Sequence, residues 1–492
     1  MDKKVKYTLL AALGAAAASV PIKAALYTPE KIEVPPMEDE AVDLERFRKN
    51  LSDAIKFKTI AAKEAVNTDW TVFDAFHDFL KERYPLIHSK LDLTVVARGS
   101  LVFRWKGSRS DLDPIALLAH QDVVPISEGT WDDWTHDPFE GFDDGEFIWG
   151  RGALDMKNHL IGVLESVETL LSEDFVPERD VYILLGHNEE IMCASNENGA
   201  TCICEYLKEK GVHLDAIIDE GGAILPVNVK GVINRHLAGI GVAEKGYADV
   251  EVSVTAKGGH SSQAPNHTAI GHLADVIKDI EGHQFKAKVS PMIRELLDKV
   301  GRSCSYPVRL VTCNMKLLEP VVAKVGSFIP PAASMLRTTF GITMTSGSPQ
   351  ANVLPQKASV TVNFRMFPGQ TVDDVLEHLH KVIRNKNVEI NLLPGWKNPS
   401  AVSPSDSRSF KIIETICRSM NDDVVVAPYL VMGGTDACHY QPICENIYRY
   451  SPFLVSTSLL LTTHGTNERI PVAVMADGVK FFKRYIRLAS AE

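Results

Sequence analysis

Acidic pairs follow apolar runs at two points of this sequence. Glu189 and Glu190 come soon after the run Val181–Gly186, and Asp219 and Glu220 end the run "AIIDE". Neighbouring carboxylates repel each other and cost free energy when they are desolvated, so packing alone does not favour them. Because a bound cation would offset both costs, the pattern predicts a metal site.

Two histidines extend this candidate ligand set. His120 ends a third apolar run in "AHQDVVP", and His464 follows a late run in "LLTTHGTNE". Asp122 stands two residues after His120, so in an extended chain its carboxylate is on the same side and can orient the imidazole. Asp155 lies in the loop "GRGALDMKN". Imidazole nitrogens mixed with carboxylate oxygens suit zinc better than magnesium or calcium.

These residues are enough for two metal ions if one carboxylate bridges them. Two adjacent cations can polarise a carbonyl and activate water near neutral pH. Only one glutamate of the pair Glu189 and Glu190 needs to bind metal. The other is then free to carry a proton from the water to a leaving group. We therefore expect a hydrolytic metal centre.

The elements that must position these residues alternate along the chain. Buried strands are expected where apolar runs are continuous, and helices where apolar residues recur at helical spacing. The order predicts an α/β domain with a mainly parallel sheet, helices on both faces and a site at the carboxyl ends of the strands. The expected segments are strand "DPIALLAHQD", helix "HLIGVLESVETLLSE", strand "DVYILLGHN", helix "GATCICEYLKEKG" and strand "LDAIIDEGG".

A different pattern fills the chain from 244 to 395. "YADVEVSVTAKG" alternates as a half-exposed strand should, and further strands are expected around "LLEPVVAKVG", "RTTFGITMTSG" and "KASVTVNFRMFPG". This predicts an inserted α+β domain, called the lid domain below. The catalytic domain is then expected in two parts, 40–243 and 396–492.

The composition is that of a globular enzyme with an apolar leader. The 492 residues carry a formal net charge of −11 and no long basic run, which argues against a nucleic-acid partner. Residues 1–25 place Lys3, Lys4 and Lys6 before a short apolar run. This is typical of a signal peptide and predicts a secreted or luminal protein without stable membrane association, with a retained single-pass signal anchor as the alternative.

The motifs in their order resemble one family. "AHQDVVP", "GRGALDMK", "GHNEE", "DEGG", "KGGHSS", "NFRMFPGQT", "GGTDACHY" and "THGTNE" are similar to the aminoacylase and carboxypeptidase S family of co-catalytic zinc peptidases and amidohydrolases. Within it the secreted N-fatty-acyl-amino-acid synthase/hydrolase branch is the most similar. The resemblance covers most of the chain from about Val42 onward.

The resemblance implies roles for individual residues. It implies Glu189 as general base, Asp122 behind His120, and two zinc ions per chain. The peptide bond after Asp155 is often cis in such proteins. The implied zinc ligands are His120, Asp155 as the bridge, Glu190, Asp219 and His464, with Glu220 as the alternative to Asp219.

The same resemblance implies residues of the lid domain. His260 would stabilise the oxyanion, often in the active site of a partner subunit, so a homodimer through the lid domain is expected. Asn352 and Arg365 would hold a substrate carboxylate, for which the planar guanidinium of arginine is well suited.

Two positions depart from the family pattern. Asn188 stands where the family usually has aspartate, and Cys438 follows "GGTDA" where the strand-end motif commonly has arginine. Neither change removes a ligand or the base. The two departures therefore bear on substrate preference and not on the reaction.

The sequence thus predicts a zinc-dependent amidohydrolase that cleaves, and under favourable concentrations forms, the amide of N-acyl, above all N-fatty-acyl, amino acids. The alternative is a metallocarboxypeptidase or dipeptidase acting on small peptides with the same site. A third reading, a binding protein that has lost catalysis, would require a missing ligand or base, and the sequence lacks none of them.

Overall fold

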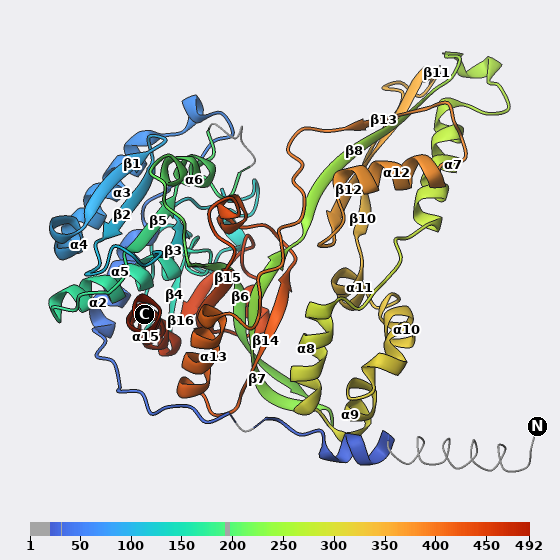
Figure 1. Cartoon of the computed structure of the whole chain (residues 1–492). Helices are drawn as coiled ribbons and strands as arrows, with labels where there is room; N and C mark the ends of the chain where they lie inside the picture. Colours follow the sequence, from blue (N-terminus) through green and yellow to red (C-terminus); the bar gives the residue numbers. More distant parts are fainter. Residues whose placement is uncertain (1–19, 31, 192–196) are drawn as a thin grey trace, which may run out of the picture.

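The computed structural model describes residues 20–30, 32–191 and 197–492. Its two largest sheets each pack against their own helices (Figure 1). The larger sheet has eight strands and the smaller has four. Figure 1 shows the smaller sheet projecting away from the larger one, so the lid domain stands apart from the catalytic domain. The predicted fold class, an α/β domain with an inserted α+β domain, is confirmed.

The eight-stranded sheet is mainly parallel. Parallel pairing joins β5, β3, β6 and β15 in the middle and β7 with β14 at one edge, whereas β1 and β2 are antiparallel at the other edge. In sheet order the strands are β1 (Asp92–Val96), β2 (Ser100–Trp105), β5 (Val181–Gly186), β3 (Ile115–His120), β6 (Ala216–Val229), β15 (Ile447–Leu454), β7 (Ile233–Glu244) and β14 (Val424–Val431).

Helices cover both faces of this sheet because its central strands are apolar on both sides. In β3, Leu117 belongs to one buried cluster with helices α2, α5, α13 and α15, and its neighbour Leu118 belongs to another with helix α6. The bounds of these helices are α2 (Leu44–Ile55), α5 (Lys157–Ser172), α6 (Gly199–Glu209), α13 (Arg408–Met420) and α15 (Met475–Ser490). Helices α3 (Trp70–Arg83) and α4 (Pro85–Lys90) precede β1.

The lid domain is built on an antiparallel sheet. Alternate residues of β8, such as Val250 and Val252, are buried against two helices, α7 and α12. The strands, in sheet order, are β10 (Thr339–Ser346), β12 (Lys357–Met366), β8 (Gly246–Thr255) and β13 (Val388–Leu392), and the helices are α7 (Ala269–Gly282) and α12 (Val372–Val382). A short ladder of β9 (Gly259–His260) and β11 (Val353–Leu354) forms the far end of the domain (Figure 1).

Two segments differ from the sequence prediction. "LLEPVVAKVG" is not a strand: it lies in α10 (Met315–Gly326), one of four helices that follow α7 and precede β10 in the chain and lie below the lid sheet in Figure 1. The run that begins at Ala216 continues through β6 into an antiparallel hairpin with β7. The other three of the four helices that include α10 are α8 (Pro291–Arg302), α9 (Tyr306–Thr312) and α11 (Pro330–Leu336). The domain bounds themselves stay a prediction.

Most of the predicted leader, residues 1–25, lies outside the described residues. Residues 20–26 are helical, and Ala24 and Tyr27 pack against Cys313 next to α9. No helix in the described part of the chain is long and apolar enough to span a membrane.

Candidate metal centre

The candidate ligands gather where strands of the larger sheet end. His120 is the last residue of β3, and Glu189 and Glu190 follow β5. Glu220 lies in β6, beyond the part of that strand that pairs with β3. Because β3, β5 and β6 are parallel neighbours, their carboxyl ends meet at one edge and bring these side chains together.

Asp155 joins two groups of candidate ligands. Its Oδ1 lies 3.1 Å from Nε2 of His120, which in turn is 3.1 Å from Oε1 of Glu220. Its other oxygen, Oδ2, lies 3.0 Å from Nε2 of His464, which is also 3.0 Å from Oε2 of Glu190. Each oxygen of Asp155 thus faces a different histidine, which is the arrangement a bridging carboxylate requires.

Glu220, and not Asp219, lies in this group. Oδ2 of Asp219 accepts the backbone N–H of Ala437 at 2.9 Å, and the side chain is buried. Neighbouring residues of a strand point to opposite faces, so only one of the two acids can face the centre. The geometry therefore corrects the preference for Asp219 in favour of the alternative, Glu220.

Asp122 lies behind His120, as expected, and also supports the two glutamates. Its two carboxylate oxygens each accept a backbone N–H, from Glu189 and Glu190, at 3.0 Å. Its Oδ1 lies 3.4 Å from Nδ1 of His120, whereas the carbonyl oxygen of Asp122 is closer to that nitrogen, at 3.0 Å. Asp122 thus fixes the turn that carries both glutamates as well as the imidazole.

The carboxylates crowd one another. Burial raises the pKa of Glu189 well above its ordinary value, and the charges of Glu220, Asp436 and Glu190 add to the shift. Burial and the charge of Asp155 likewise raise the pKa of Glu220. This cluster is unfavourable without positive charge, and its donors, two imidazoles and several carboxylates, fit a pair of zinc ions.

Sequence reasoning assigned no role to Glu468, which holds the Asp155 loop. Its Oε1 accepts the backbone N–H groups of Leu154 and Asp155 at 2.8 and 3.1 Å, and its Oε2 accepts from Arg151 at 2.6 Å. Glu468 is fully buried. The available signal was its place in "THGTNE", four residues after His464. The peptide bond between Asp155 and Met156 is cis, as the resemblance implied.

The lid residues are not gathered at this centre. His260 is exposed in β9, where it pairs with Val353 of β11, and the backbone carbonyl of Asn352 accepts from Ser261 at 3.0 Å. Figure 1 shows β11 at the end of the lid domain that is farthest from the larger sheet. Arg365 lies near the carboxyl end of β12, whereas Asn352 precedes the start of that strand. β12 has 10 residues, so its two ends are roughly 30 Å apart. Asn352 and Arg365 of one chain therefore do not form the predicted clamp.

The Asn188 departure has a structural reason. Its Nδ2 donates to the carbonyl of Glu197 at 2.8 Å, and its Oδ1 accepts the N–H of Gly199, the first residue of α6, at 2.8 Å. An ionised aspartate has no hydrogen to donate to Glu197. The amide therefore anchors the start of α6 and leaves the metal centre unchanged.

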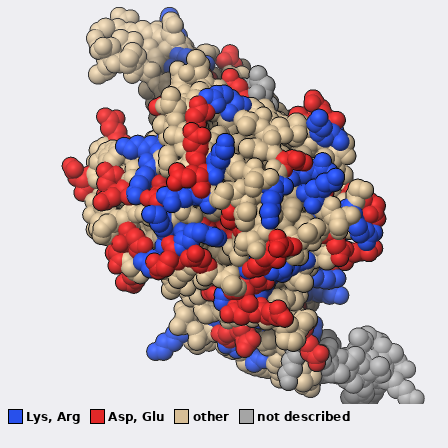
Figure 2. Space-filling view, turned by 90° about the vertical axis from the view of Figure 1, so that its left-hand side faces the viewer, with Lys and Arg blue, Asp and Glu red and all other residues tan. Residues whose placement is uncertain are grey.

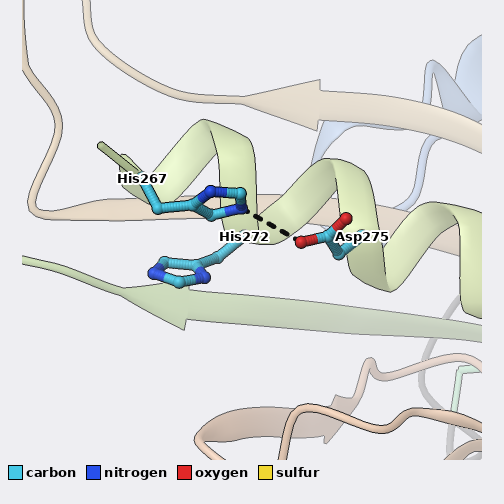
Figure 3. Close-up of side chains that lie close together, drawn as sticks. All are labelled: His267, His272 and Asp275. Carbon is cyan, nitrogen blue, oxygen red and sulfur yellow. Dashed lines mark hydrogen bonds and ion pairs between the residues drawn. The ribbon is translucent and has the colours of Figure 1, made fainter. Parts of the chain in front are cut away.

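A second group of possible ligands lies on the lid domain. His267, His272 and Asp275 come together at the start of α7 (Figure 3). Nε2 of His267 lies 3.0 Å from Asp275, with both side chains about half exposed. An exposed ion pair explains this contact, and we assign no metal to it.

The fold and this site define a metal-dependent hydrolase. The chain belongs to the peptidase family M20/M25/M40, which residues 116–488 match. Enzymes of this family are typically dinuclear zinc enzymes that cleave amide bonds. The predicted family is thereby confirmed.

The chain is similar to curated relatives of two kinds. The chain is 38% identical over 443 residues to a probable carboxypeptidase S-like 2 of Dictyostelium discoideum, covering 89% of this chain and 84% of that one. It is 32% identical over 450 residues to the N-fatty-acyl-amino acid synthase/hydrolase PM20D1 of Mus musculus, covering 90% and 88%.

Among solved structures, an M20 metallo-carboxypeptidase from Sulfolobus solfataricus matches with a TM-score of 0.64 and 18% identity, covering 90% of this chain and 99% of that one. Human carnosine dipeptidase 1 matches with a TM-score of 0.57 and 14% identity, covering 91% and 97%. At these identities the likeness shows the fold alone.

Proposed function

We propose that this hydrolase cleaves the amide bond of N-acyl amino acids with a substantial, fatty acyl group. The observation that carries the acyl preference is a cavity of about 220 Å³ beside Asp155 and Glu220. Apolar side chains form much of its lining: Leu154, Phe453, Val455 and Leu460. A pocket of this kind next to the reacting centre suits a hydrocarbon chain better than a charged peptide.

In this proposal His120, Glu220, His464, Glu190 and Asp155 would together hold two zinc ions. Bound zinc would polarise the substrate carbonyl and activate water. Glu189 takes the proton of the attacking water and delivers it to the amide nitrogen that leaves. The carboxylate of Asp122 holds Glu189 in place by accepting the backbone N–H of Glu189.

A homodimer completes the proposed site. His260 is exposed at the far end of the lid domain and has no contact with the ligand cluster of its own chain among the described residues. A lid that reaches a second subunit would bring His260 and Asn352 to that subunit's centre, where the imidazole stabilises the oxyanion. Figure 2 agrees with this use, because the protruding upper end of the molecule shows few charges on that face.

The experiment compares three substrates on zinc-loaded enzyme: a long-chain N-acyl amino acid, its N-acetyl analogue and a blocked dipeptide with the same C-terminal residue. We expect the highest kcat/KM with the long-chain substrate. Preference for the dipeptide would favour the alternative, a carboxypeptidase S-like enzyme. Turnover of none of them by protein that contains two zinc ions would exclude both.

Secretion or luminal export by cleavage after the leader is proposed as well. The support is the sequence of residues 1–25, in which lysines precede a short apolar run. N-terminal sequencing of protein from the native source checks it: a retained leader would favour the signal anchor.

A further inference from the structure

A lysine at the root of the lid domain lies against the strand-end motif "GGTDAC". Lys397 follows β13, and its backbone exchanges two hydrogen bonds of 2.9 Å with Tyr247, the second residue of β8. Its Nζ lies 3.6 Å from Sγ of Cys438. The ammonium also lies directly over Gly434, where any Cβ would collide with it. The strand-end motif "GGTDAC" thus contacts this cation through two of its residues.

The Lys397 ammonium has no carboxylate in direct contact among the described residues. Glu244, one of the acids that act electrostatically on Lys397, is bound to Arg449 and to Thr435. Burial raises the pKa of the Cys438 thiol to about 12, so the thiol is neutral at physiological pH. A half-buried cation that, in the described part of the chain, has a neutral thiol as its one hydrogen-bonding side-chain partner can accept an anion from outside.

Lys397 stays protonated. Burial lowers its pKa, but Cys438, and after it Glu244 and Glu189, outweigh this effect and raise the pKa above its ordinary value. Ala437, the residue before Cys438, donates its backbone N–H to Asp219, the neighbour of the proposed ligand Glu220, so the motif that Lys397 contacts borders the metal centre. An anion bound by Lys397 would therefore lie close to the reacting amide.

Arg365 shares the face of Lys397. In the lid sheet Arg365 pairs with Tyr247 from one side, and Lys397 pairs with Tyr247 from the other. Residues directly opposite one another on neighbouring strands place their side chains on the same face. The guanidinium of Arg365 lies over the Tyr247 ring at 4.8 Å. Two cations therefore flank one tyrosine where the lid joins the catalytic domain.

We propose that Lys397 binds the substrate carboxylate together with Arg365, and supplies the positive charge that an arginine in place of Cys438 would otherwise provide. This inference rests on the proposed function, since the carboxylate is that of the amino-acid part of the substrate. Lysine is a compact point charge without the planar fork of arginine, so it accepts carboxylates in more than one orientation. With cysteine in place of arginine at position 438, the geometry of carboxylate recognition changes, but Lys397 keeps a positive charge at the site.

The test removes the charge with Lys397→Met and measures kcat and KM for an N-acyl amino acid and for its carboxamide. A charge-assisted hydrogen bond is lost only with the free acid, so KM for the acid should rise about tenfold to a hundredfold. Its kcat and both constants for the carboxamide should change little. The double variant Lys397→Met, Cys438→Arg should regain most of the loss. Lys411→Met, at an exposed lysine of α13, is the matched control.

A binding measurement keeps the outcome separate from the proposed function. Calorimetry with zinc-loaded Glu189→Gln protein measures affinity for the N-acyl amino acid without turnover. Weaker binding after Lys397→Met supports the inference whatever the wild type hydrolyses. Unchanged binding, or an equal loss for acid and carboxamide, overturns it. Melting temperature and zinc content of each variant show whether Lys397→Met has damaged the fold instead.

Discussion

Adjacent residues with different tasks dominate the chemistry at the scale of single side chains. Glu189 and Glu190 are neighbours in the chain and share the support of Asp122, yet only Glu190 contacts His464. Asp219 and Glu220 divide in the same way, one facing Ala437 and the other His120. Two acidic residues that are adjacent in the chain therefore have different roles: one is a proposed metal ligand and the other is not.

Glu189→Gln should reduce kcat about a hundredfold or more while zinc content stays at the wild-type level, because glutamine cannot take the proton. Glu190→Gln should instead lose zinc, since it removes a carboxylate oxygen beside His464. Turnover and metal analysis of both purified variants decide this. If the two variants lose zinc equally, the division of roles is wrong.

Zinc binding to the metal-free protein should release protons at pH 7.5. Hydrogen bonds to Asp155 and Glu190 raise the pKa of His464 to about 10, so the free imidazole is protonated at this pH, while a ligand nitrogen must be deprotonated. The raised pKa values of Glu189 and Glu220 act in the same direction. Calorimetric titrations in buffers of different ionisation enthalpy count the protons. A value of zero would contradict the proposed centre.

At the scale of helices and strands, the sequence predicts what a continuous apolar run determines. The runs that end at His120 and before Glu189 are strands because both of their faces are buried. The segment Leu317–Gly326 misled the same reasoning, since "VVAKV" is rich in β-branched residues and Pro320 disfavours a helix interior. Packing in the tertiary structure stabilises this segment as a helix, and a local sequence pattern does not reveal such packing.

The candidate site could be predicted only as a set of residue types at strand ends. Which face Asp219 or Glu220 presents depends on the strand's register in the folded sheet. The role of Asp122 depends on a turn that brings two amide hydrogens to it. Arg365 and Lys397 are distant in sequence and become neighbours only because both pair with Tyr247.

Leu460 lies at the apolar cavity beside the metal centre, and the short helix α14 (Thr457–Leu460) ends there. Leu460→Trp should fill the cavity and lower kcat/KM for a long-chain N-acyl amino acid by roughly tenfold, since each buried methylene contributes about 0.8 kcal/mol. The N-acetyl substrate should be little affected. Leu461→Trp, at a neighbour that is 78% exposed, is the control. Equal losses for both substrates would count against an acyl pocket.

At the scale of the whole molecule, the projecting lid decides how many chains make one active site. Ligands and base come from one chain, while His260 and Asn352 stand at the far end of its lid domain. Arg365 and Lys397 lie at the root of that domain. If lids are exchanged in a dimer, each site would combine the root of its own lid with the tip of another.

Mixing two inactive variants tests this exchange. Glu189→Gln keeps a working His260, and His260→Ala keeps a working metal centre, so a mixed dimer holds one complete site if His260 acts across subunits. Random pairing should then restore about a quarter of the wild-type activity, because half of the dimers are mixed and each has one working site. Activity is measured after the two variants are unfolded and refolded together, with each refolded alone as control. If the mixture stays as inactive as its components although light scattering shows a dimer, His260 acts within its own chain. An active His260→Ala variant on its own would show that His260 takes no part in catalysis.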